Sequence, residues 1–291
     1  MQVHLRPNSC VLQVGELFFK AVAGINAAEP AVTALLAKRF PNMVPAVLAT
    51  DPGRGWMLQR DGGRSLRSLT RGTDDLARWE PLMRAFARMQ IDAAGILDAL
   101  LAAGLEDRRL GHIPALYDAL VDSPRLLGAE HPDGIPEAEL AAMRTRRGEV
   151  REFCDHLAAY QVPDTIRHDD FHANNIMVDG ERYGVIDWGE SYAGHPFGSL
   201  FMALRYAAYL CDLQDDHPAL LALRDAYLEE WTAFEPLPRL VEAYGHAARL
   251  QALSRALTWG DFMVSVDVAL MPEYEGSAEY WLRLFMGFDP D

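Results

Sequence analysis

The sequence predicts an α+β protein with two unequal lobes, a small β-rich lobe over residues 1–60 and a larger, mainly helical lobe over residues 61–291. Short apolar runs separated by turn residues fill the first sixty positions, as in β-hairpins. From residue 64 onward, apolar residues recur every three or four positions, which is the spacing of amphipathic helices. One further hairpin interrupts this helical pattern over residues 166–190 and carries a dense group of polar side chains.

The composition excludes several classes of protein. Half of the 291 residues are apolar, which is enough for a proper core. No run approaches the ~18 apolar residues of a membrane span, and the first residues lack the pattern of a signal peptide. Cys10, Cys154 and Cys211 are odd in number and far apart, so neither a disulfide framework nor a zinc site is expected. These features predict a cytoplasmic protein with reduced thiols.

The net charge of −15 argues against nucleic acid as a partner, because binding to phosphate backbones depends on Lys and Arg. Cationic ligands fit this charge better. The alternative is that an acidic surface simply keeps the protein in solution.

A hairpin is expected at the start of the first lobe. Residues 10–14 and 17–22 flank Gly15-Glu16, a connection whose leading glycine suits a type II′ turn. Lys20 lies in the second of these strands and is one of only two lysines, against 25 arginines. An ammonium group suits contact with nucleotide phosphates better than a guanidinium fork does. An edge-strand lysine that faces water is the alternative.

The rest of the first lobe contains one helix and two strands. Asn26 to Glu29 form a candidate capping box for a helix over residues 31–39. Strands are expected over residues 44–49 and 56–59, with an ordinary turn between them. Residues 59–63 follow as the link between the lobes, and their two glycines would permit hinge motion.

The second lobe is expected to contain seven helices. The first opens at Thr73 and carries an apolar stripe through Met89, which predicts a core position. The other six are expected over residues 96–105, 113–121, 137–160, 196–211, 218–234 and 240–259.

The hairpin within the second lobe brings polar residues together. Residues 175–178 and 183–186 are apolar runs separated by a turn-forming insert. Pairing about this turn sets Asn175 opposite Asp187, beside the loop that carries Asp170. An amide oxygen next to a carboxylate makes a hard-oxygen site suited to Mg²⁺, which takes one or two protein carboxylates together with waters and substrate phosphates.

The pattern His168-x-Asp170-x-x-x-x-Asn175, followed by Asp187-Trp188-Gly189, resembles the catalytic and metal loops of protein-kinase-like phosphotransferases. It is most similar to the aminoglycoside phosphotransferase and choline kinase family, which has His-Gly-Asp-x-His-x-x-Asn. This chain differs by carrying Asp169 where Gly is usual. The resemblance implies a bilobal protein-kinase-like fold with the active site between the lobes.

The resemblance also implies roles for residues of the second lobe. Asp170 would orient the acceptor hydroxyl and accept its proton, and His168 would brace the loop. His172 takes the place of the protein-kinase lysine that faces the transferring phosphate. Asn175 and Asp187 would hold Mg²⁺.

In the first lobe, the resemblance implies a nucleotide site for ATP or another nucleoside triphosphate. Lys20 would contact phosphates and form an ion pair with Glu29. The same glutamate is part of the candidate capping box, so these two roles compete. No glycine-rich turn precedes the lysine strand, and Ser9 is the candidate phosphate contact in its place. The adenine would meet the backbone of the link, at Gln59, Arg60 and Asp61.

The function expected is therefore Mg²⁺-dependent transfer of the γ-phosphate of ATP to a hydroxyl of a small molecule, in antibiotic resistance or in metabolism. A metal-dependent phosphohydrolase that uses His168, Asp169 and Asp170 is one alternative. The other is a catalytically silent binding protein that kept the fold, which the glycine-free turn favours.

The acceptor is expected to be cationic or neutral. From Asp187 to the C-terminus there are 17 Asp and Glu residues against 6 Arg. Four residues in this region could line a pocket for an amine-bearing acceptor, with aromatic faces adding cation–π contacts: Glu190, Trp259, Asp261 and Asp267. The alternative is that these carboxylates are spread over a solvated surface.

Overall fold

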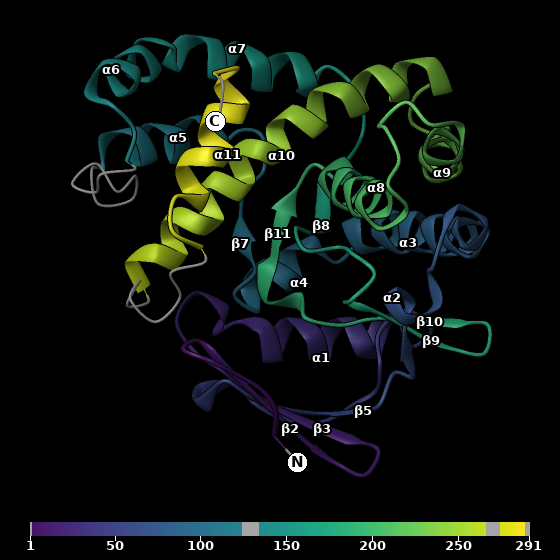
Figure 1. Cartoon of the computed structure of the whole chain (residues 1–291). Helices are drawn as coiled ribbons and strands as arrows, with labels where there is room; N and C mark the ends of the chain where they lie inside the picture. Colours follow the sequence, from purple (N-terminus) through teal and green to yellow (C-terminus); the bar gives the residue numbers. More distant parts are fainter. Residues whose placement is uncertain (1, 124–133, 266–273, 289–291) are drawn as a thin grey trace.

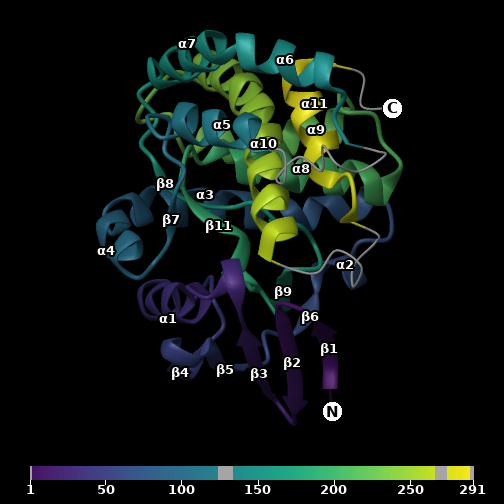
Figure 2. The same ribbon diagram turned by 90° about the vertical axis from the view of Figure 1, so that its left-hand side faces the viewer.

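The computed structural model describes residues 2–123, 134–265 and 274–288 of the chain. An antiparallel sheet from the N-terminal residues lies at one end of the molecule, and helices from the rest of the chain form the other end (Figure 1). The view from the side shows the same division (Figure 2). The predicted α+β class is confirmed. Within the described ranges, no helix has the length and apolar character needed to cross a membrane.

The N-terminal sheet contains five strands in the order β1-β2-β3-β5-β4. Their bounds are Gln2–Arg6, Ser9–Val14, Leu17–Val22, Val47–Asp51 for β4 and Trp56–Arg60 for β5. Val14 pairs with Leu17 across the predicted hairpin. Gly15 has a φ of 59° and Glu16 is not among the positive-φ residues, as a type II′ turn requires. Strand β1 was not predicted, and it pairs with β2 through a bulge at its start.

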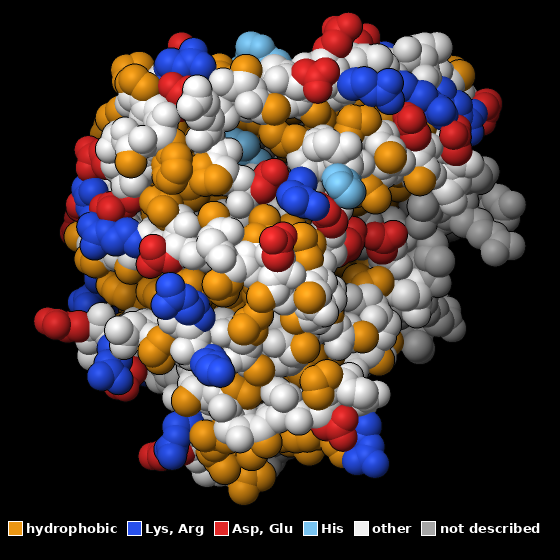
Figure 3. Space-filling model, turned by 180° about the vertical axis from the view of Figure 1, so that it is seen from behind, with side chains coloured by type: hydrophobic (Ala, Val, Ile, Leu, Met, Phe, Trp, Pro, Cys, Tyr) orange, Lys and Arg blue, Asp and Glu red, His pale blue; other side chains and the backbone are white. Residues whose placement is uncertain are grey.

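The two faces of this sheet differ, because successive side chains of a strand point to opposite sides. Lys20 and the buried Met57 are paired residues on the face directed toward helix α1 (Glu29–Arg39), which lies between the sheet and the helical lobe (Figure 1). Leu12 and Trp56 lie on the opposite face and are exposed. Apolar side chains gather at this end of the molecule (Figure 3).

Two small three-stranded sheets position the central hairpin. One has the order β10-β9-β6 and the other β7-β11-β8. Their strands are β6 (Arg64–Ser65), β7 (Glu106–Asp107), β8 (Thr165–His168), β9 (Ile176–Asp179), β10 (Arg182–Val185) and β11 (Ser191–Gly194). The loop between β8 and β9, residues 169–175, is called the catalytic loop below.

The link between the lobes is packed against the hairpin, since β6 pairs with β9. Gly63 has a φ of 99°, and a Cβ there would lie 2.4 Å from the carbonyl oxygen of Val178. The glycine thus permits the close approach of two backbones. The division of the chain at residues 59–63 and a hinge motion there stay predictions.

The helical lobe contains α2 to α11. Their bounds are Leu66–Leu69, Trp79–Ala94, Leu97–Ala102, Ile113–Asp122, Glu137–Thr145, Arg147–Ala158, Phe197–Cys211, Pro218–Glu229, Leu237–Ser265 and Ser277–Met286. A 3-10 turn over Thr73–Arg78 precedes α3.

Several helix boundaries differ from the prediction. The single helix expected over residues 137–160 is wrong, because the chain bends at Arg146 and forms α6 and α7, which both pack on α5. Helix α9 ends at Glu229, and α10 begins three residues earlier than expected and continues to Ser265. Helix α11 was not predicted.

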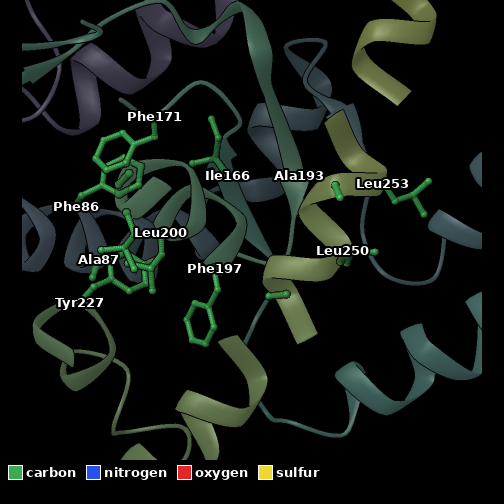
Figure 4. Close-up of a cluster of buried hydrophobic side chains, with 14 of the residues drawn as sticks. Phe86, Ala87, Ile166, Phe171, Ala193, Phe197, Leu200, Tyr227, Leu250 and Leu253 are labelled. Atoms are coloured by element: carbon green, nitrogen blue, oxygen red, sulfur yellow. The ribbon is translucent and has the colours of Figure 1, made fainter. Parts of the chain in front are cut away.

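The core extends directly beneath the catalytic loop. Phe171 of that loop stacks on Phe86 of α3, with ring centroids 3.9 Å apart and an interplanar angle of 15° (Figure 4). Both side chains are fully buried. The predicted apolar stripe of α3 is confirmed as core, since Trp79, Leu82 and Met83 are fully buried as well. The loop therefore packs directly on the apolar core.

Candidate active site

His168 holds the catalytic loop from behind, at the end of β8. Its Nδ1 accepts a hydrogen bond from the backbone N–H of Asp170 at 3.2 Å, and its Nε2 lies 3.0 Å from the carbonyl oxygen of Ile186. Burial lowers the pKa of His168, so the ring is neutral, and the two contacts fix the tautomer with the proton on Nε2. The backbone N–H of His168 donates to Ser199 Oγ at 2.8 Å. The ring thus connects the loop to the hairpin.

The Asp170 carboxylate is held on both sides. His172 Nε2 lies 3.1 Å from Asp170 Oδ1, and Asn175 Nδ2 donates to Asp170 Oδ2 at 2.8 Å. Burial alone would raise the pKa of Asp170, but the bond to His172 and its charge hold this pKa below the ordinary range. Asp170 is therefore a fixed, ionised carboxylate, and about a quarter of its side chain is exposed.

The predicted register of the hairpin is wrong by one residue. The turn consists of Gly180-Glu181 alone, Asp179 pairs with Arg182, and Ile186 donates its N–H to the carbonyl of Asn175 at 2.9 Å. Asp187 lies one position beyond this pair and adopts a left-handed conformation, with φ 65° and ψ 54°.

The oxygen donors still meet at one cavity, which Asn175 and Asp187 both line together with Asp170. Because Asn175 directs its amide nitrogen at Asp170, its Oδ1 remains available as a ligand. The described residues contain no cluster of three or more His, Cys, Asp or Glu side chains of the kind that binds a metal by itself. One carboxylate and one amide oxygen fit Mg²⁺, which keeps waters and binds substrate phosphates.

Lys20 joins the first lobe to the hairpin. Its Nζ lies 2.6 Å from Glu29 Oε1 and 2.5 Å from Asp187 Oδ1. Burial acts to lower the pKa of Lys20, but the two carboxylates outweigh it and raise this pKa. Burial raises the pKa of Glu29 to about 7, although Lys20 acts in the opposite direction.

The predicted ion pair of Glu29 is thus confirmed and its capping role is wrong. Helix α1 begins at Glu29 itself, after Ala28, and has no side-chain cap, while Asn26 ends a separate 3-10 turn. The Glu29 carboxylate cannot serve its own helix because it faces Lys20.

A cavity of about 330 Å³ lies between the N-terminal sheet and the hairpin. Among its lining residues are all the residues predicted for the nucleotide except Glu29: Ser9, Lys20, Gln59, Arg60 and Asp61. Gln59 Nε2 is buried and has no hydrogen-bond partner among the described residues. We call this space the sheet-side cavity.

A second cavity of about 460 Å³ contains Asp170, His172 and Asn175. We call it the loop-side cavity. The two cavities share His4, Ser9 and Asp187, so they are contiguous. His4, on the unpredicted strand β1, had no motif to reveal it.

The four residues predicted for the acceptor have different positions. Glu190 and Trp259 line the loop-side cavity, and Glu190 forms an ion pair with Arg255. Asp261 is not among the residues that line either cavity, and it pairs with Arg108 at 3.3 Å, so these cavities do not support the acceptor contact predicted for it. Asp267 lies outside the described residues.

Asp169 faces away from both cavities and is fully buried. Its Oδ2 accepts hydrogen bonds from Ser254 Oγ at 2.7 Å and from Arg167 Nη2 at 3.0 Å. Since Arg167 is buried and Ser254 lies on α10, the residue at the usual glycine position ties the catalytic loop to that helix. The alternative metal cluster of His168, Asp169 and Asp170 does not form, because both ring nitrogens of His168 are bonded elsewhere.

A loop of this kind between two lobes defines a kinase-like phosphotransferase. A family model described as a phosphotransferase enzyme family matches residues 26–237, and the chain belongs to this family. It is therefore a phosphotransferase. A search of curated proteins finds no match to the sequence.

The fold is also that of solved small-molecule kinases. An ethanolamine kinase from Plasmodium vivax matches with a TM-score of 0.63 and 12% identity over 99% of this chain and 83% of its own. A choline/ethanolamine kinase family protein from Mesorhizobium loti matches with a TM-score of 0.52 and 20% identity, over 99% of this chain and 92% of its own. A macrolide 2′-phosphotransferase from Brachybacterium faecium matches with a TM-score of 0.56 and 16% identity, over 98% of this chain and 90% of its own. These likenesses show the protein-kinase-like fold.

Proposed function

We propose that the protein transfers the γ-phosphoryl group of ATP, in the presence of Mg²⁺, to a hydroxyl of a small molecule. The observation that supports this most directly is the meeting of two cavities at Asp187. Lys20 approaches this carboxylate from the sheet side, and the loop that carries Asp170 lies on the other side. The reaction needs positioning and charge stabilisation more than a covalent nucleophile, and the residues present supply both.

The sheet-side cavity is the proposed nucleotide site. The unpartnered Gln59 amide and the backbone of residues 59–61 would meet the adenine, and Lys20 would contact phosphate oxygens while Glu29 holds its ammonium in place. Asn175 and Asp187 are the residues that would hold Mg²⁺. The bound ion would neutralise phosphate charge as the group is transferred.

The loop-side cavity is the proposed acceptor site. Asp170 accepts a hydrogen bond from the acceptor hydroxyl and takes its proton as the oxygen attacks. Its low pKa makes orientation of the hydroxyl the larger part of this role. The ring of His172 lines this cavity, and the Asp170 carboxylate raises the pKa of His172 against the effect of burial.

The acceptor itself is proposed to be cationic or neutral at the end that enters this cavity. Three carboxylates line it, those of Asp170, Asp187 and Glu190. Burial raises the pKa of Glu190 to about 7 against the influence of Arg255. Its carboxylate form can accept a hydrogen bond from an amine or a hydroxyl, and its protonated form can donate one to a hydroxyl oxygen.

The test is ADP release from ATP and Mg²⁺ in a screen of amino alcohols, amino sugars and hydroxylated antibiotics. We expect at least one compound to accelerate ADP release and to gain phosphate, as seen by mass spectrometry. Nucleotide binding without any turnover across the screen would favour the silent binding protein instead.

A further inference from the structure

Asn26 carries a buried oxygen whose hydrogen-bonding capacity is not used. This residue ends the 3-10 turn over Gly24–Asn26 in the first lobe, caps no helix, and lines the loop-side cavity. It is 8% exposed, and its Oδ1 has no hydrogen-bond partner in the described part of the chain. A buried carbonyl oxygen without a partner costs free energy, so its presence at a cavity indicates a ligand that supplies a donor.

The surroundings of Asn26 direct this oxygen away from the protein interior. A Cβ on Gly189 would lie 3.0 Å from both Cγ and Nδ2 of Asn26, so the amide nitrogen faces Gly189 and Oδ1 is the more distant atom. Gly189 is not among the residues that line the loop-side cavity, whereas its neighbour Glu190 is. The oxygen is therefore the atom of this amide that can meet a ligand in the cavity.

The turn that carries Asn26 is held by the helical lobe on two sides. It contacts the 3-10 turn Trp188–Glu190, which follows Asp187. It also contacts the end of α10, where a Cβ on Gly24 would lie 3.8 Å from Cβ of Ser265. Figure 2 shows this end of α10 next to the first lobe. Asn26 is thus a side chain of the first lobe at a fixed place in a cavity that both lobes line, as a binding residue needs to be.

The charge of the loop-side cavity indicates which kind of donor fits. Asp170 and Glu190 line the same cavity as Asn26, and their carboxylates attract a cation. Asp170 is proposed to hold the reacting hydroxyl, so the amine of an acceptor would lie elsewhere in the cavity. A primary ammonium group offers three N–H donors, whereas a quaternary ammonium group has the same charge and none. Only the first can satisfy the Asn26 oxygen.

We propose that Asn26 is a specificity-determining residue of the acceptor site, whose Oδ1 accepts a hydrogen bond from an N–H of the acceptor while the acceptor hydroxyl lies at Asp170. This inference rests on the proposed function and narrows the acceptor to amino alcohols whose nitrogen keeps at least one hydrogen. A trimethylated amine would enter the same cavity and leave the Asn26 oxygen without a partner.

The experiment compares ethanolamine with choline, which differ only by three N-methyl groups. Both carry one positive charge and the same hydroxyethyl arm, so the cavity carboxylates attract them alike. We expect kcat/KM, from ADP release with ATP and Mg²⁺, to be about ten- to a hundredfold higher for ethanolamine, because choline leaves a buried acceptor unsatisfied.

Variants of Asn26 test whether this oxygen causes the preference. Asn26→Leu and the smaller Asn26→Ala both remove the oxygen and should lower the ethanolamine-to-choline ratio about tenfold or more, while KM for ATP stays unchanged. Asn26→Asp keeps an oxygen at the same place and should keep the preference, since its added charge acts on both cations. Asn8→Leu is the matched control, because Asn8 lines the same cavity but is only partly buried and has no orphaned atom, so the ratio should stay that of the natural chain.

Calorimetric binding of both compounds separates this inference from the proposed function. Tighter binding of ethanolamine that Asn26→Leu and Asn26→Ala abolish, without phosphoryl transfer, would support the role of Asn26 and overturn the kinase assignment. Phosphoryl transfer without a preference for ethanolamine, or with a preference that both variants keep, would overturn the role of Asn26 and leave the kinase assignment in place. If neither compound binds and no compound of the screen is phosphorylated, both are wrong.

Discussion

Asp169 and Asp170 are neighbours in the chain, yet they face opposite sides of the catalytic loop. The Asp169 side chain is fully buried and bonded to Arg167 and Ser254, whereas about a quarter of the Asp170 side chain is open to the loop-side cavity. We call the side of the loop that Asp169 faces the closed side, and the side that Asp170 faces the open side. The same chemical group thus holds the loop in place on one side and meets ligands on the other.

Two histidines, one on each side of the loop, have pKa values that are shifted in opposite directions. On the open side, Asp170 raises the pKa of His172 against the effect of burial. On the closed side, burial and then the charge of Arg167 lower the pKa of His195 to about 3. The open side therefore favours the protonated form of its histidine, whereas burial and the charge of Arg167 favour the neutral form of His195. Residues of the open side should control catalysis, and those of the closed side should control stability.

The largest effect is expected for Asp170→Asn. Loss of the charged base should lower kcat by about 10²–10⁴. The amide has nearly the same shape, so the free energy of unfolding should change little. Steady-state ADP release and denaturant unfolding of the same preparation measure the two quantities. A variant that keeps more than half of the natural activity would show that Asp170 is not the base.

The converse is expected for Asp169→Ala. Removal of this carboxylate leaves Arg167 buried without its partner, which should lower the free energy of unfolding by about 3–5 kcal/mol. Asp179→Ala, at the exposed end of β9, is the control and should stay within about 0.5 kcal/mol. If Asp169→Ala unfolds like this control, the closed side contributes little to stability.

The open side could be predicted from the sequence better than the closed side. Its residues form a local motif with fixed spacing, so the pattern from His168 to Asn175 was sufficient to bring Asp170, His172 and Asn175 together. The partners of Asp169 are Arg167, two positions away, and Ser254 on α10, 85 positions away. No local pattern connects Asp169 to Ser254, because tertiary packing alone brings them together.

The errors in the predicted fold have local causes. The register of the hairpin was misjudged by one position: pairing about Gly180-Glu181 sets Asn175 opposite Ile186, and Asp187 lies one residue beyond this pair. Strands β7, β8 and β11 have two to four residues each, too few for a periodic signal. Most helix stripes were long enough to be recognised, but several helix ends, the break at Arg146 and helix α11 were not predicted.

Substitution of the two proposed Mg²⁺ ligands, Asp187 and Asn175, is a further test of the open side. Asp187→Ala should weaken the Mg²⁺-dependent part of ATP binding about tenfold or more, and Asn175→Ala should weaken it less, because a neutral amide supplies less charge than a carboxylate. Titrations of ATP with and without Mg²⁺ give this difference directly. Asp179→Ala is again the control, and an equal loss in that variant would contradict the assignment of the two ligands.

The smallest effect concerns the closed side and pH. His195 stays neutral in the folded protein, with its pKa near 3, whereas the unfolded chain binds a proton near the ordinary value of 6.5. A depressed folded pKa of a histidine means that stability is complete above about pH 6.5 and falls as the pH decreases below it. Between pH 7.5 and pH 6 the loss from this residue should be about 0.8 kcal/mol. His195→Asn removes the titrating group, so its unfolding free energy should decline less than that of the natural chain over this interval. Parallel pH profiles of the two proteins would show that His195 gains its proton as readily in the folded state, and that burial and the charge of Arg167 do not keep it neutral.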